Sequence, residues 1–113
     1  MKRDLELCRK ILFTVEEDRS PWAIAGFRRE VISRHVVLLS EADLLVVTNL
    51  GDLEGDDFRV ERLTWLGHEF LDMARNETVW QSVRSDLKKR SIDVPLSVLI
   101  ELLKRGVAAL FGL

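Results

Sequence analysis

The chain has 113 residues, of which 47% are hydrophobic and 32% are charged, a balance that excludes intrinsic disorder and suits one compact domain. The 17 Lys and Arg residues against 19 Asp and Glu give a net charge of −2, which excludes a general electrostatic attraction to nucleic acid. Any DNA binding must therefore come from a local patch. The single cysteine, Cys8, excludes an internal disulfide.

Membrane insertion is not expected either. A spanning helix needs about 20 consecutive apolar residues, and the most apolar stretch, residues 94–113, is interrupted by Glu101, Lys104 and Arg105. No charged leader with an apolar core opens the chain. We therefore expect a cytoplasmic protein that does not bind membranes.

The first predicted element is a helix over residues 4–16, with a stripe of apolar side chains on one side. Cys8 belongs to this stripe, so we expect a small core side chain rather than a reactive thiol. Pro21 ends the helical region, and the short apolar segment 22–25 predicts a first β-strand.

A second helix is predicted over residues 27–42. Its inner face carries His35, which we expect to be a hydrogen-bonded, half-buried side chain rather than a catalytic one. Its outer face carries Arg29 and Ser33, with Arg34 on the flank. Asp43 stands where a helix commonly ends in a left-handed residue.

Two strands and a loop follow. Residues 44–50 and 58–63 have strand composition, and loop-forming residues 51–57 separate them, so the sequence predicts a β-hairpin wing. Thr64 is a good N-cap, and either one bent helix or two helices fill residues 64–90. Pro95 opens a last helix that reaches about Phe111.

The last helix carries more apolar surface than a small core needs. Its stripe either covers the core of the same chain or forms a homodimer or partner interface, and the sequence leaves both alternatives open. The interface candidates are Leu99, Leu102, Leu103, Val107, Leu110 and Phe111.

Three segments carry a resemblance to a known family: MKRDLELCRKIL (1–12), RHVVLLSEADLLVV (34–47) and RLTWLGHEFLDMAR (62–75). They resemble the short bacterial and phage proteins grouped as domain of unknown function 2513. The resemblance implies a winged-helix fold and brings no established catalytic residue. Two features depart from the pattern: Asp43 stands where the family usually has Gly, and the positioning helix of a full helix-turn-helix is reduced or absent.

The predicted fold is therefore α+β, a winged helix with a three-stranded β-wing sheet and extra C-terminal helices. Residues 1–75 would form the winged-helix domain. Residues 76–113 would be a helical extension that packs on it, giving a single domain overall.

The leading functional hypothesis is a small DNA-binding transcriptional regulator. Residues on the second helix would face the major groove and the wing's return strand would hold phosphate. The candidates are Arg28, Arg29, Ser33, Arg34, Arg59 and Arg62. The wing tip argues against this hypothesis, because a loop that usually lies near phosphate carries four carboxylates, although a solvated turn is the simpler reading. These carboxylates belong to Asp52, Glu54, Asp56 and Asp57.

The alternative is a protein-interaction module that binds a host or phage protein through the acidic wing and the C-terminal apolar stripe. Near-neutral charge favours it. Cys8, His35 and His68 lack the spacing of metal ligands, and no nucleophile with a base is recognisable. We therefore expect no enzymatic activity, no metal and no cofactor.

Overall fold

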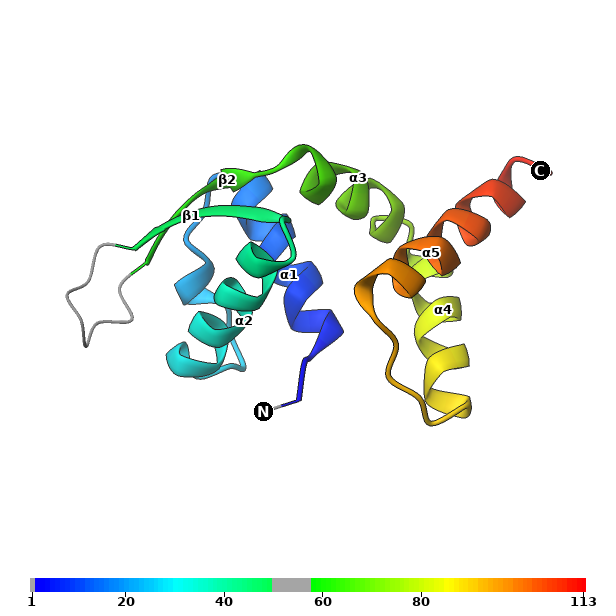
Figure 1. Cartoon of the computed structure of the whole chain (residues 1–113), viewed down its shortest axis with the longest axis horizontal. Helices are drawn as coiled ribbons and strands as arrows, with labels where there is room; N and C mark the ends of the chain where they lie inside the picture. Colours follow the sequence, from blue (N-terminus) through cyan, green and yellow to red (C-terminus); the bar gives the residue numbers. More distant parts are fainter. Residues whose placement is uncertain (1, 50–57) are drawn as a thin grey trace. The chain divides into compact units, whose positions relative to one another are not determined.

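The computed structural model describes residues 2–49 and 58–113 (Figure 1). The described residues form five α-helices, one 3₁₀ helix and two β-strands. In chain order these are α1 (Leu5–Glu16), η1 (Pro21–Ala23), α2 (Arg29–Glu41), β1 (Leu45–Asn49), β2 (Phe58–Leu63), α3 (Trp65–Ala74), α4 (Glu77–Lys89) and α5 (Leu96–Leu110). The chain divides into two compact units, Met1–His68 and Glu69–Leu113, called unit 1 and unit 2 below.

Helix α1 confirms the first predicted helix. Asp4 caps it, because its carboxylate Oδ1 accepts a hydrogen bond from the Leu7 N–H at 3.0 Å. Cys8 is buried, as the apolar stripe predicted. This burial, with a smaller contribution from the Asp4 carboxylate, raises the pKa of the Cys8 thiol to about 11. The side chain is therefore a protonated core group at neutral pH.

The predicted strand at residues 22–25 is wrong, because the chain turns there instead of extending. Pro21 stands at the first position of η1, where its fixed φ suits a helical turn, and its carbonyl accepts the Ile24 N–H at 3.3 Å. The Arg29 guanidinium lies 4.7 Å from the centre of the Trp22 ring. The hydrogen bond closes the turn, and the contact between Arg29 and Trp22 joins this segment to α2.

The sheet in the described residues consequently has two strands, β1 and β2. The α+β class broadly fits, but the described chain is mostly helical, and the predicted winged helix with a three-stranded β-wing sheet is wrong. The predicted loop 51–57 and its four carboxylates lie outside the described residues.

The hairpin begins where the sequence predicted. Asp43 adopts a left-handed conformation with φ 64° and ends α2. The strands pair antiparallel from Leu45 opposite Leu63 to Asn49 opposite Phe58. Arg62 pairs with Val46 and Val60 with Val47, so Glu61 has no partner on β1 and forms a β-bulge.

Unit 1 is held together by contacts between its helices and the hairpin. Helix α1 packs on α2 and β2, and α2 packs on β1. Thr64 ties the hairpin to α3: its hydroxyl donates to the Asp43 carbonyl and accepts from the Gly67 N–H at 2.9 Å. A Cβ at position 67 would collide with the Leu44 carbonyl oxygen, so this close approach requires glycine.

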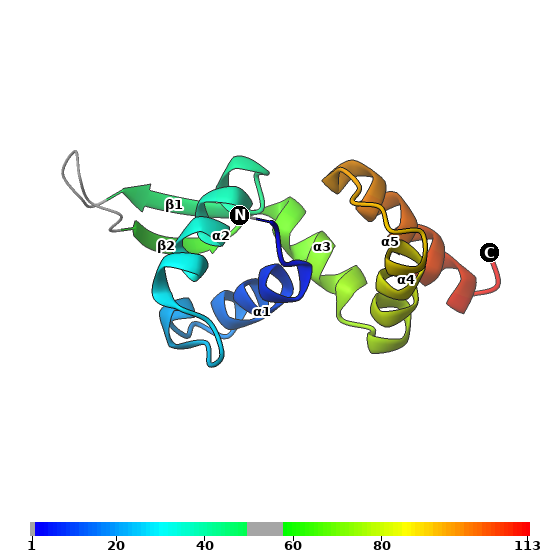
Figure 2. The same cartoon turned by 90° about the horizontal axis from the view of Figure 1, so that it is seen from below.

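Unit 2 contains the end of α3 and the helices α4 and α5. Two separate helices fill the region after Thr64, because Asn76 starts a new one: its Oδ1 accepts from the Val79 N–H at 3.0 Å. The Phe70 and Trp80 rings meet edge to face with centroids 6.3 Å apart. Helices α4 and α5 pack against each other (Figure 2).

None of the helices in residues 2–49 and 58–113 is long and apolar enough to cross a membrane.

Candidate functional site

The two arginines at the start of α2 both contact side chains of the same chain. The Arg28 Nη1 lies 3.0 Å from the Glu30 Oε1, and Arg29 lies over the Trp22 ring. Both arginines remain exposed. A phosphate or base edge would therefore compete with an existing partner at each of them.

Ser33 is not on the outer face where the sequence placed it. It is buried, with 8% of its surface exposed. Helix α2 packs against α1, β1 and η1, so more of its surface is covered than the apolar stripe alone predicted. Arg34 is exposed, as predicted.

The exposed face of α2 carries charges of both signs. Glu30, Arg34 and Glu41 are exposed, and their spacing places them on one side of the helix. One cation stands among two carboxylates on this face. The face therefore lacks the positive potential that attracts a phosphate backbone.

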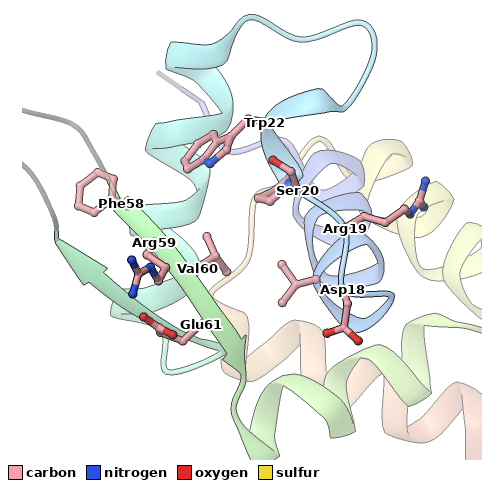
Figure 3. A pocket seen from close by; sticks show the side chains of 10 residues that line it. Asp18, Arg19, Ser20, Trp22, Phe58, Arg59, Val60 and Glu61 are labelled. Atoms are coloured by element: carbon pink, nitrogen blue, oxygen red, sulfur yellow. The ribbon is translucent and has the colours of Figure 1, made fainter.

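The two candidate arginines of β2 are both exposed. The Arg62 Nη1 donates to the Leu63 carbonyl at 3.0 Å. Arg59 shares one side of the strand with Glu61, whose carboxylate accepts from the Thr48 hydroxyl at 3.1 Å (Figure 3). The hairpin thus presents mixed charge rather than a block of cations.

The structure reveals a groove of about 450 Å³ in unit 1 that the sequence did not predict. One wall is the segment of residues 18–22, and the other wall is the first part of β2, residues 58–61 (Figure 3). The apolar lining residues are Val15, Pro21, Trp22, Phe58 and Val60.

Side chains around the groove differ in direction. Val60 points into it from β2, whereas Arg59 and Glu61 point to the other side of the strand (Figure 3). Arg19 points away and pairs with Glu17 at 3.2 Å. Asp18, held at φ 58°, forms no ion pair with any described residue. The lining of the groove therefore mixes apolar side chains with polar groups, among them the Asp18 carboxylate.

The sequence did not predict this groove, because the predicted strand over residues 22–25 would have begun in the first wall, at Trp22. A strand over residues 22–25 would pair with the hairpin and fill the space, whereas η1 leaves it open. Pro21 directly before the apolar residues was the available signal, since proline favours the first position of a helical turn.

The predicted interface residues at the C-terminus differ in burial and fall into three groups. Leu99 and Leu103 are buried, so they belong to the core rather than to a surface. Leu102 and Val107 are half-buried. Leu110 and Phe111 are exposed, at 56% and 77% of their surface. Of the predicted interface residues, only those at the C-terminal end are therefore exposed.

His35 serves the structure of unit 1. Its Nε2 accepts from the Asp4 N–H at 2.9 Å, and its Nδ1 lies 2.8 Å from the Val31 carbonyl, which fixes the Nδ1–H tautomer. The imidazole is fully buried, more than the half-burial expected. Within the described part of the chain, no three His, Cys, Asp or Glu side chains form a group that could hold a metal ion.

Comparison with known proteins shows the family to which the chain belongs. An uncharacterized protein of Haemophilus influenzae is 35% identical over 105 residues, which cover 88% of this chain and 89% of that protein. No solved structure is significantly similar. The family described as hypothetical protein (DUF2513) matches residues 2–93, which confirms the resemblance noted in the sequence, and the chain belongs to this family.

Proposed function

We propose that the protein is a protein-interaction module whose partner binds in the groove of unit 1. The observation that carries this proposal is the group of apolar side chains that lines part of the groove, beside a strand edge that pairs with no described strand. Concave apolar surfaces with a few polar groups are where proteins commonly bind their ligands.

The charge distribution supports a protein partner over DNA. The exposed face of α2 carries Glu30 and Glu41 beside Arg34, and Ser33 is buried. Protein interfaces tolerate such mixed charge, because their core is apolar and their rim is polar. DNA binding instead depends on several cations that neutralise phosphates.

Site-specific photo-cross-linking tests this function. We would place p-benzoylphenylalanine at position 20 in the native host, because Ser20 is exposed and lines the groove. The control is position 85, since Ser85 is an exposed serine on α4. A discrete protein adduct at position 20 and none at position 85 supports the proposal. Equal adducts at both positions, or none at either, contradicts it.

DNA binding is the second candidate, favoured by the exposure of Arg34, Arg59 and Arg62. Its test is fluorescence anisotropy with a pool of random duplexes at low and physiological salt. Binding through several phosphates would weaken steeply as salt rises. It would also be lost when the three arginines are changed to Ala. Salt-insensitive or absent binding argues against this candidate.

A homodimer through the end of α5 is a separate prediction, favoured by the exposure of Leu110 and Phe111. Light scattering on the purified chain measures its mass. A dimer that becomes a monomer on Phe111→Ser would support the prediction, with Ser97→Ala, an exposed change on the same helix, as the control.

A further inference from the structure

The groove also indicates how a partner would bind. We propose that an extended segment of the partner protein adds a third strand to the outer edge of β2. This inference rests on the protein-interaction function proposed above, and it specifies the geometry and the chemistry of the partner.

The unpaired edge of β2 is the first argument. The sheet of the described residues contains β1 and β2 alone, so one edge of each strand has no strand partner among them. Such an edge presents a row of backbone N–H and C=O groups, which an extended peptide can pair with. The edge of β2 is the one that borders the groove, because residues 58–61 line it.

The space beside this edge is the second argument. The segment of residues 18–22 forms the opposite wall, and η1 turns this segment away from strand geometry. The backbone of the chain therefore leaves room next to β2 where a third strand would lie. An incoming strand would form hydrogen bonds with the free backbone N–H and C=O groups of this edge without displacing a strand of the described chain.

The bulge at Glu61 limits where the incoming strand can pair. A bulge disrupts the regular hydrogen-bond ladder and twists the edge, which also discourages nonspecific pairing. The regular part of β2 at the groove is Phe58 to Val60. We therefore expect the partner segment to pair alongside these residues and to end near Glu61.

The groove side chains determine which peptide fits. Alternate residues of an added strand face the same side, and on the groove side they would meet Val15, Val60 and Trp22. The Asp18 carboxylate has no ionic partner among the described residues and offers a site for a cation. The preferred segment is an extended peptide with an apolar residue facing the groove and a Lys or Arg nearer Asp18.

A display library of random linear peptides, selected on the full chain, tests this inference. We expect enriched peptides to alternate apolar residues with polar ones and to include a basic residue. Bound peptide should shift the amide resonances of residues 58–61 and 18–22. Methylating one edge-facing peptide nitrogen removes a backbone hydrogen bond and should weaken binding about fivefold or more.

Two variants of β2 supply the control. Val60→Thr changes a side chain that points into the groove and should weaken peptide binding, whereas Arg62→Ala changes an exposed side chain of the same strand outside the groove lining and should leave it intact. Asp18→Asn should remove the preference for a basic residue in a repeated selection. Circular dichroism confirms that each variant is folded.

Four results would overturn the inference. Peptides could bind with resonance shifts outside the groove, backbone methylation could leave affinity unchanged, or selection could enrich no peptide. The first two results would contradict strand addition alone. The proposed interaction function would still be supported if a protein adduct forms at position 20. Pairing of the β2 edges of two copies, seen as a doubled mass that Val60→Thr abolishes, would also overturn it, because the edge would then be occupied by the chain itself.

Discussion

At the scale of single residues, two polar side chains, His35 and Cys8, are buried in the core of unit 1. His35 joins the start of α1 to α2 through its two ring nitrogens, and Cys8 sits in the core as a neutral thiol. Helical periodicity predicted the inward position of both residues. It did not predict that the Asp4 N–H would be the partner of His35, because that contact joins residues far apart in the sequence.

Replacing His35 with Ala should destabilise the protein. The change leaves the Asp4 N–H and the Val31 carbonyl without their side-chain partner and opens a cavity, which together cost about 2–3 kcal/mol. Chemical denaturation measures this loss. The control is His68→Ala, an exposed change that should stay within about 0.5 kcal/mol of the original protein. Equal effects of the two changes would contradict the structural role of His35.

Cys8 should make the protein less stable at alkaline pH. Burial raises the pKa of its thiol from 9.0 to about 11, so between these values the folded chain keeps a proton that the unfolded chain has lost. This stabilising contribution is complete below pH 9 and disappears as pH rises through 11, a change on the order of 2–3 kcal/mol.

The measurement is the free energy of unfolding of the protein and of Cys8→Ala across this range. The Ala variant lacks the thiol but keeps every other titrating group. The stability of the original protein relative to the variant should therefore fall with rising pH. A constant difference would show that the thiol does not have a raised pKa.

At the scale of elements, short-range signals predicted most of the described helices and strands. Asp43 and Thr64 marked the end of α2 and the start of α3, and the hairpin strands followed their composition. The strand predicted over residues 22–25 was wrong, because four apolar residues form a strand only if a neighbouring strand pairs with them. Ser33 is buried as well, and the periodicity within α2 could not predict this, because it does not say how many neighbouring elements pack on the helix.

The junction of hairpin and α3 should be intolerant of any side chain at position 67. Gly67→Ala would drive its Cβ into the Leu44 carbonyl, and we expect a loss of about 1–3 kcal/mol. Gly106→Ala is the matched change within a helix, where the new Cβ meets only the Val79 side chain. Because a side chain yields more readily than backbone, thermal unfolding should rank Gly67→Ala as the less stable variant. The reverse order would contradict the close approach at Gly67.

At the scale of the whole molecule, composition limited the function without defining it. A net charge of −2 predicted that DNA binding would need a local patch, and the structure distributes the candidate arginines among carboxylates. The groove could not be predicted, because its two walls are separated in sequence and its width depends on how η1 turns.

Salt should affect partner binding only weakly. An added strand would bind through backbone hydrogen bonds, apolar contacts and one exposed ion pair with Asp18, so a selected peptide should lose little affinity between low and physiological salt. Anisotropy titrations at the two salt concentrations measure this. A steep loss with salt would indicate that cations of the protein dominate recognition, as in binding to nucleic acid.

Amide hydrogen exchange of β2, with and without a selected peptide, reports whether a peptide strand pairs with the outer edge of β2. Strand addition predicts that peptide slows exchange at edge-facing amides of residues 58–60, while the amides of β1 that already pair with β2 change little. Unchanged exchange along β2 in the presence of saturating peptide would contradict the claim that this edge receives the partner.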